Sequence, residues 1–269
     1  MTPDELARAE PDAPRALADV ARRLMIYAHR GARAHAPENT LLAFRLAMAL
    51  GSDGIECDVQ RSADGGLVVI HDATLDRTTT GKGRVSARPL SGLGVLDAGR
   101  GQRIPTLEEV LAFARESACW LNLELKAETP EEARATGEAM APALAALAEA
   151  WRVRVLVSSF DLAALLMLKR AQPWLRVATL HGGREWRRRD ILAPALEMGA
   201  EAIHPGVSLV TSGLVRRAHD HGLRVNVWTA NRTSTILGLM ELGVDGLFTD
   251  NPERVVILRT LAASGSQLL

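Results

Sequence analysis

Short runs rich in β-branched residues alternate along the chain with segments of helical length that are rich in Ala, Leu, Glu and Arg. This alternation predicts βαβ units around a parallel sheet, because two parallel strands need a long crossover between them. The runs predict nine strands, at residues 25–29, 54–59, 67–71, 120–126, 154–159, 176–180, 201–204, 224–228 and 246–249.

Nine strands are one more than an eight-stranded barrel needs, and the short turn at Asp64-Gly65 identifies the extra one. Seven residues, 60–66, separate the second run from the third, whereas a parallel crossover needs about a dozen. Asp-Gly readily supplies the positive φ angles of a tight hairpin turn. We therefore expect residues 67–71 to run antiparallel to residues 54–59, which leaves eight parallel strands.

The expected fold is an α/β protein, a (β/α)8 TIM barrel with a β-hairpin after its second strand and a short N-terminal helical extension. A barrel of this kind typically fills about 250 residues, and the chain has 269. We place the extension at residues 1–24 and the barrel domain at residues 25–269.

Charge and hydropathy argue against two classes of partner. Lys plus Arg and Asp plus Glu each number 32, so the chain lacks the basic excess of a nucleic-acid-binding protein. No stretch reaches the roughly 18 apolar residues that span a bilayer, and residues 1–24 show no secretory pattern. Cys57 and Cys119 lie in apolar runs and form no disulfide framework. We expect a cytoplasmic protein without stable membrane insertion.

Two of the expected strands carry acidic residues on a single face. Side chains alternate along a strand, so Glu56 and Asp58 share one face of their run, and Glu124 and Lys126 share one face of theirs. Leucines occupy the opposite face of the second run and belong against the helices, so the polar faces are expected inside the barrel. The hairpin should return His71 to the level of Asp58, at the end of the barrel where active sites lie.

Three carboxylates in one confined mouth indicate a divalent cation. Like charges held together repel and lose hydration unless they are compensated. Oxygen ligands suit Mg²⁺, Ca²⁺ or Mn²⁺ better than Zn²⁺. The alternative is a salt-bridge layer in which Lys126 pairs with the carboxylates, and it leaves a three-to-one acidic excess unexplained.

His29-Arg30-Gly31 ends the first expected strand. A His at a strand end is more often a loop anchor, so an acid/base function for His29 depends on His71 at the same mouth. The Arg30 guanidinium suits phosphate, and Gly31 permits a sharp turn.

Other residues at the strand ends are ambiguous from sequence. Phe160 and Trp228 fit the wall of a small polar substrate and fit rim packing equally well. His181 is expected on a loop or the surface, whereas His204 lies near a strand end and could line the pocket.

Many short motifs in the same order give the chain from Ala28 to about Glu253 a resemblance to the glycerophosphodiester phosphodiesterases. They are Ala28-His29-Arg30-Gly31, Pro37-Glu38-Asn39-Thr40, Asp53-Gly54-Ile55-Glu56-Cys57-Asp58-Val59, Asp64-Gly65, His71-Asp72, Ile104-Pro105-Thr106-Leu107, Glu124-Leu125-Lys126, Ser159-Phe160, Trp228-Thr229-Ala230-Asn231 and Gly243-Val244-Asp245-Gly246.

The resemblance implies hydrolysis of small-molecule glycerophosphodiesters to glycerol 3-phosphate and an alcohol. It also implies the following roles by position: Glu56, Asp58 and Glu124 as ligands of Mg²⁺ or Ca²⁺; His29 and His71 as acid and base; Arg30 and Lys126 as phosphate ligands; Phe160 and Trp228 against the glycerol or head group.

The implied substrate suggests a mechanism. The 2-hydroxyl of glycerol lies beside the phosphodiester, so intramolecular attack has a large entropic advantage. We expect His71 to act as base and His29 as acid, with a cyclic glycerol phosphate that then adds water.

One departure leaves two rival functions open. Residues 97–103 lead directly into Ile104, where this family usually carries a longer, aromatic-containing stretch, so the outer pocket wall is not predicted. A shortened wall could admit lysophospholipids, as in a lysophospholipase D. A non-catalytic barrel that binds a phosphorylated ligand would be signalled by loss of His29 or His71, and both are present.

Overall fold

Eight parallel strands form a closed ring in the computed structural model, which describes residues 13–183 and 190–265. The strands run in the order β1-β9-β8-β7-β6-β5-β4-β2, and pairing of β1 with β2 closes the ring. Their bounds are β1 Met25–His29, β2 Gly54–Arg61, β4 Trp120–Leu125, β5 Val155–Ser159, β6 Arg176–His181, β7 Ala202–Pro205, β8 Arg224–Val227 and β9 Gly246–Thr249. This is a TIM barrel, and the predicted fold class is confirmed.

The ninth strand, β3 (Leu67–Val69), lies outside the ring and pairs antiparallel with β2. The predicted hairpin is therefore confirmed, although the strand ends two residues earlier than expected. The chain continues with Ile70, whose N–H donates to the Asp58 carbonyl at 2.9 Å. This bond fixes the backbone next to His71 beside Asp58.

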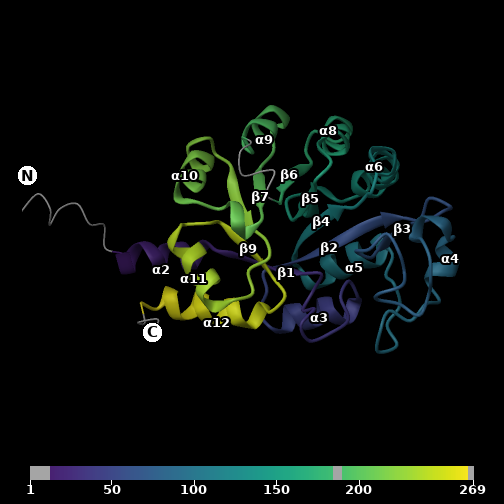
Figure 1. The fold of residues 1–269 in the computed structure, drawn as a ribbon, viewed down its shortest axis with the longest axis horizontal. Helices are drawn as coiled ribbons and strands as arrows, with labels where there is room; N and C mark the ends of the chain where they lie inside the picture. Colours follow the sequence, from purple (N-terminus) through teal and green to yellow (C-terminus); the bar gives the residue numbers. More distant parts are fainter. Residues whose placement is uncertain (1–12, 184–189, 266–269) are drawn as a thin grey trace, which may run out of the picture.

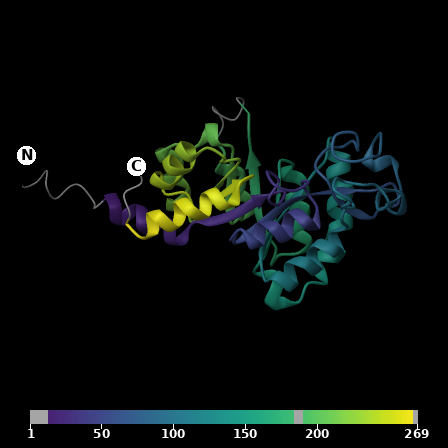
Figure 2. The ribbon, with the colours of Figure 1, turned by 90° about the horizontal axis from the view of Figure 1, so that it is seen from below.

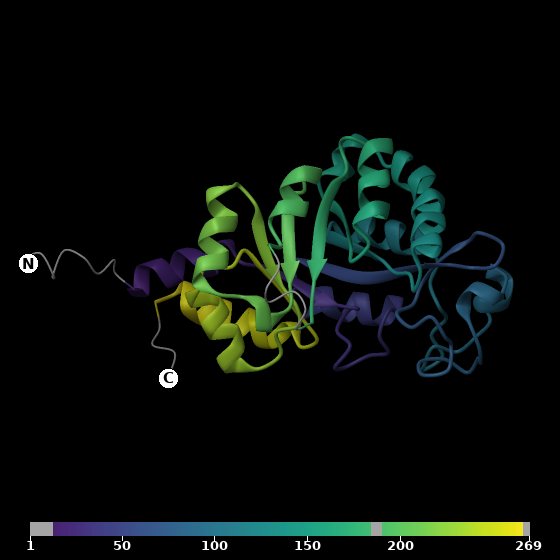
Figure 3. The same cartoon turned by 45° about the horizontal axis from the view of Figure 1, so that its top comes forward.

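Helices surround the strands (Figures 1 and 3). They are α2 Ala13–Arg23, α3 Leu41–Ala49, α4 Leu90–Leu93, α5 Leu107–Ser117, α6 Pro130–Ala145, α7 Glu149–Arg152, α8 Leu162–Ala171, α9 Ala193–Met198, α10 Ser212–Asp220, α11 Thr233–Glu241 and α12 Pro252–Ala263, with 3-10 turns η1 Val85–Ala87 and η3 Val207–Leu209. Within residues 13–183 and 190–265, no helix is long and apolar enough to cross a membrane.

Helix α2 represents the described part of the expected N-terminal extension, and residues 1–12 lie outside the described range. It packs beside α12 on the outside of the barrel (Figures 1 and 2). Ala21 and Leu24 are buried in a hydrophobic cluster that includes Val255 and Leu258 of α12. The helix therefore shares its core with the barrel.

Residues 70–106 form a long excursion at the β3 side of the barrel (Figure 1). The segment has a small hydrophobic core of its own, made with one residue of β3: Val68, Ile70, Leu75, Val85, Leu93, Ala98 and Ile104. The Val69 N–H donates to the Pro105 carbonyl at 2.9 Å, which ties both ends of the excursion to the hairpin.

Strand register brings the acidic residues together. His29 is level with Glu56 in the β1–β2 pair, and Asp58 is level with Glu124 in the β2–β4 pair. The alternate residues Cys57 and Leu123 are buried in the apolar cluster between strands and helices. The polar faces therefore meet inside the mouth of the barrel, as the alternation predicts.

Candidate functional site

Three carboxylates form the centre of the site. Glu56, Asp58 and Glu124 each place an oxygen within 4.8 Å of the others. Glu56 is 2% exposed and Asp58 is 0% exposed. Glu56 Oε1 and Asp58 Oδ1 are buried without a hydrogen-bond partner, which is costly for charged oxygens.

The electrostatics of this cluster favour a bound positive charge. Burial, reinforced by Asp58 and Glu124, raises the pKa of Glu56 well above its usual range. Burial, followed by the charge of Asp58, raises the pKa of Glu124 to about 7. A divalent cation would compensate these carboxylates and occupy the two unpartnered oxygens. The residues present therefore fit such an ion.

Lys126 only partly supports the salt-bridge alternative. Its Nζ donates to Glu124 Oε1 at 2.9 Å and lies 3.8 Å from Asp58 Oδ1. Glu56 Oε1 keeps no partner. One ammonium thus leaves much of the acidic excess uncompensated.

Arg30 links the carboxylates to the turn after β1. Its backbone N–H donates to Glu56 Oε2 at 2.8 Å, and its Nε lies 3.2 Å from Asp58 Oδ2. The guanidinium also donates to Glu38 at 3.0 Å. Arg30 and Gly31 both have positive φ, at 56° and 80°. A Cβ on Gly31 would lie 2.7 Å from the Ala43 Cβ, so only glycine fits this turn.

Asn39 orients Asp58 from the loop before α3. Its Nδ2 donates to Asp58 Oδ2 at 2.7 Å, and its Oδ1 accepts from the Asp58 N–H at 3.3 Å. This pair of bonds fixes the carboxylate rotamer. An oriented carboxylate suits either a metal ligand or an anion-binding network.

His29 is paired with Asp250, which follows β9. Its Nδ1 lies 2.7 Å from Asp250 Oδ1. Burial raises the pKa of Asp250, but the hydrogen bond and charge of His29, with the charge of Arg33, outweigh burial and hold the pKa below its usual range. The ionised Asp250 therefore orients the imidazole.

His71 has a similar partner at the opposite side of the mouth. Its Nδ1 lies 2.7 Å from Asp72 Oδ1, and its Nε2 lies 3.1 Å from Lys126 Nζ. Arg77 bonds both Asp72 and Glu38, so the excursion is tied to the loop before α3. The hydrogen bond from Arg77 is the largest cause that lowers the pKa of Asp72.

A cavity of about 240 Å³, which we call the inner cavity, connects these groups. Its lining residues are His29, Arg30, Glu56, His71, Asn122, Glu124, Lys126, Phe160, Leu180, His204, Trp228 and Phe248. Phe160 and Trp228 meet edge to face with ring centroids 5.7 Å apart. Of the predicted site residues, all but Asp58 line this cavity, and Asp58 lies directly behind it in the carboxylate cluster.

The sequence expectation for His181 is wrong. His181 ends β6 and is fully buried, with its Nε2 2.8 Å from Thr179 Oγ1. Burial lowers its pKa to about 4. His204, which the sequence places near a strand end where it could line the pocket, does line the inner cavity, and burial lowers its pKa to about 3. Both imidazoles are therefore neutral near pH 7.

Sequence reasoning assigned no function to Asp72, Asp250, Asn39 or Asn122. Asp72 directly follows His71 and Asp250 directly follows β9, so their positions at strand ends were an available signal. Asn122 lies on the polar face of β4 and donates to Ser158 Oγ at 2.9 Å. The contact of Asn39 with Asp58 depends on the fold of a loop, which no periodicity reveals.

Comparison with known proteins identifies the family. The model of the glycerophosphoryl diester phosphodiesterase family matches residues 29–254, which include every residue of the cluster described above. The chain belongs to this family.

Individual members are similar over nearly the whole chain. A glycerophosphodiester phosphodiesterase of Caldanaerobacter subterraneus subsp. tengcongensis is 36% identical over 250 residues, covering 87% of this chain and 97% of that protein. One from Bacillus altitudinis is 35% identical over 253 residues, with the same two coverages. The solved structure of an Oleispira antarctica phosphodiesterase in complex with the product sn-glycerol-3-phosphate superposes with a TM-score of 0.79 at 30% identity, covering 88% of this chain and 97% of that one.

Proposed function

We propose that this member of the glycerophosphoryl diester phosphodiesterase family hydrolyses glycerophosphodiesters to glycerol 3-phosphate and an alcohol. The observation that carries the proposal is the inner cavity, which joins the carboxylate cluster, two Asp-paired histidines and two cations that can bind phosphate. The product bound to the Oleispira antarctica relative supports the same substrate class.

Glu56, Asp58 and Glu124 would hold one divalent cation, Mg²⁺ or Ca²⁺, with Mn²⁺ also compatible with an all-carboxylate set. Such an ion supplies Lewis-acid stabilisation of a phosphoryl oxygen.

Arg30 and Lys126 would bind the phosphate from two sides. Both side chains line the inner cavity, and each is paired with a neighbouring carboxylate, Arg30 with Asp58 and Lys126 with Glu124. Phe160 and Trp228 would hold the glycerol half against their ring edges and faces. In that arrangement the glycerol 2-hydroxyl would face His29, which lines the same cavity.

The reaction would begin within the substrate. His29 Nε2 takes the proton of the 2-hydroxyl, and that oxygen attacks phosphorus while the bond from phosphorus to the leaving alcohol breaks. His71 gives a proton to the leaving oxygen. Water then opens the cyclic glycerol phosphate, with His71 removing the water proton and His29 returning a proton to the 2-oxygen.

These roles reverse the assignment expected from the sequence. Of the two cavities near the site, His29 lines only the inner one. His71 lines the inner cavity and also a second, larger cavity that offers space for the leaving alcohol. Burial lowers the pKa of His71, and Lys126 acts in the same direction, which alone would favour a base. The position outweighs this effect because a bound phosphodiester anion stabilises the imidazolium beside it.

The test is product identification by coupled detection of glycerol 3-phosphate. Purified protein is given glycerophosphoethanolamine, glycerophosphocholine or a lysophospholipid. The proposal expects glycerol 3-phosphate from the first two. Hydrolysis confined to the lysophospholipid would favour the lysophospholipase D alternative, and no hydrolysis of any substrate would favour a binding protein.

A further inference from the structure

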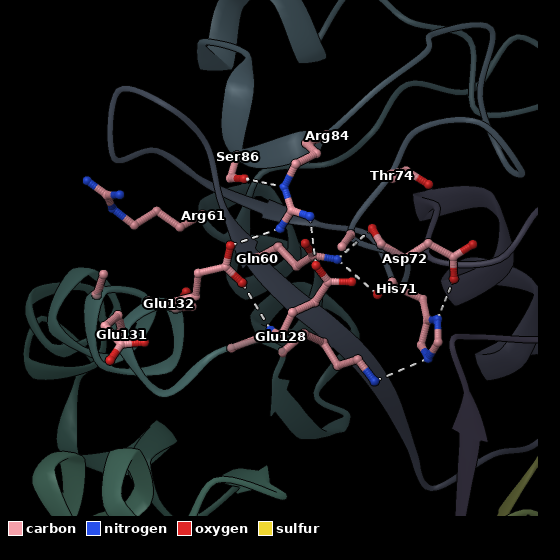
Figure 4. A pocket seen from close by; sticks show the side chains of 15 residues that line it. Gln60, Arg61, His71, Asp72, Thr74, Arg84, Ser86, Glu128, Glu131 and Glu132 are labelled. Carbon is pink, nitrogen blue, oxygen red and sulfur yellow. Dashed lines mark hydrogen bonds and ion pairs between the residues drawn. The ribbon is translucent and has the colours of Figure 1, made fainter.

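A second cavity of about 600 Å³ adjoins the inner one, and we call it the outer cavity (Figure 4). It lies between the excursion after β3 and helix α6. Its lining residues are Gln60, Arg61, His71, Asp72, Ala73, Thr74, Arg84, Ser86, Lys126, Ala127, Glu128, Glu131, Glu132, Ala135 and Thr136.

The two cavities meet at His71 and Lys126, which line both. A phosphate bound at Lys126 therefore has the inner cavity on one side and the outer cavity on the other. With the glycerol half against Trp228 and Phe160, the remaining substituent on phosphorus would extend past His71 into the outer cavity.

Arg84 closes the outer cavity by connecting the excursion to α6. Its Nη1 donates to Glu128 Oε2 at 2.7 Å, and its Nη2 donates to Glu132 Oε1 at 2.9 Å (Figure 4). Gln60 fixes the part of the wall next to His71, since its Nε2 lies within 3.0 Å of the backbone carbonyls of Ile70, His71 and Asp72. The outer wall that the sequence left unpredicted is thus built by Arg84.

The charges around this space favour a cation. The carboxylates of Glu128, Glu131 and Glu132 line this space, and the Arg84 guanidinium pairs with two of them, Glu128 and Glu132. The other two lining cations do not change the balance there. Lys126 is matched by Glu124 in the inner cavity, and the Arg61 guanidinium extends away from Arg84 in Figure 4.

The polar groups discriminate between kinds of cation. Thr74, Ser86 and the three glutamates offer oxygens that accept hydrogen bonds. Among the described lining residues there is no Phe, Tyr or Trp to form the aromatic box that suits a quaternary ammonium. An ammonium that carries N–H donors fits this lining better.

We propose that the outer cavity is the head-group subsite and that it selects a leaving alcohol with a primary ammonium, such as ethanolamine. The proposal rests on the proposed function. We assign the selectivity to Glu128 and Glu131. Glu132 is left out because its carboxylate also accepts a hydrogen bond from the Glu128 N–H at 3.0 Å, so it stabilises the turn before α6.

The test compares kcat/KM for three diesters that share the glycerol phosphate: glycerophosphoethanolamine, glycerophosphocholine and the neutral glycerophosphoglycerol. The wild type should prefer the ethanolamine ester. The double variant Glu128→Gln/Glu131→Gln keeps the side-chain volumes and should lower kcat/KM for that ester about fivefold, as loss of partly exposed charge pairs does. Its value for glycerophosphoglycerol should change less than about twofold.

The matched control is Glu138→Gln, which removes an exposed carboxylate from the same helix outside the cavity. It should leave all three values unchanged. A double variant that affects the three esters equally, or a wild type that prefers glycerophosphocholine, would overturn the head-group inference and leave the proposed function standing. A wild type that hydrolyses none of the three would overturn both.

Discussion

At the residue scale, the two site histidines have the same partner type but different surroundings. Each has Nδ1 at 2.7 Å from an aspartate oxygen. His29 faces the inner cavity only, whereas His71 Nε2 lies against Lys126 where the two cavities meet. In the mechanism that we propose, this difference in position assigns the base to His29 and the acid to His71.

The leaving group provides a test of these roles. We predict that His71→Ala lowers turnover of glycerophosphoethanolamine about 10²- to 10⁴-fold, the usual contribution of a general acid. With the p-nitrophenyl ester of glycerol 3-phosphate, the loss in the first-turnover rate of nitrophenolate release should shrink to within about tenfold, because nitrophenolate leaves without a proton and this rate does not include the later opening of the cyclic phosphate. His29→Ala should be equally damaging for both esters. Equal losses with His71→Ala would contradict the assignment.

The raised pKa of Glu124, about 7, predicts a pH-dependent stability of the metal-free protein. A carboxyl whose folded-state pKa is raised stabilises the fold below its unfolded-state pKa, and this contribution is lost as pH rises through 7. The free energy of unfolding should therefore fall from pH 5.5 to pH 8 more steeply in the wild type than in Glu124→Gln. Chemical denaturation at both pH values measures the difference. An equal pH dependence of the unfolding free energy in the wild type and in Glu124→Gln would contradict a raised pKa of Glu124.

At the element scale, the β2–β3 hairpin shows which features of the fold the local sequence predicts. Strand alternation and Asp64-Gly65 predict the antiparallel return and the proximity of His71 to Asp58, and both follow from local rules. Two backbone hydrogen bonds fix the end of β3 and the residue after it independently of the Asp64-Gly65 turn. The Ile70 N–H donates to the Asp58 carbonyl, and the Val69 N–H donates to the Pro105 carbonyl.

This independence predicts that Gly65→Ala affects stability without affecting catalysis. Gly65 has φ of 89°, and a Cβ there would have its nearest neighbour, Arg61 Nη2, at 3.6 Å. The expected loss is about 1–2 kcal/mol of unfolding free energy from backbone strain, with kcat unchanged. Gly94→Ala is the control, because Gly94 has an ordinary helical φ of −66°. A large fall in kcat for Gly65→Ala would mean that the turn positions His71.

At the scale of the whole molecule, the barrel and its carboxylate cluster could be predicted, but the second cavity could not. Periods of two residues place Glu56, Asp58 and Glu124 on inward faces, and the closed ring then brings those faces together. The outer cavity depends on Arg84 of the excursion reaching Glu132 on α6, 48 residues away in the chain. Pairings of that kind are set by loop packing and leave no periodic trace. The burial of His181 escaped prediction because β6 extends one residue further than its apolar run.

Metal-dependent phosphodiester hydrolysis at the inner cavity is the central claim, and one measurement tests it most directly. Protein stripped of metal by exhaustive chelation, and verified as metal-free by elemental mass spectrometry, is assayed for release of glycerol 3-phosphate from glycerophosphoethanolamine. Turnover should fall by at least about 10³-fold, in line with the several kcal/mol that a Lewis acid contributes. Addition of Mg²⁺ or Ca²⁺ should restore it in the wild type but not in Glu56→Gln. Unchanged turnover by the verified metal-free protein would contradict the account.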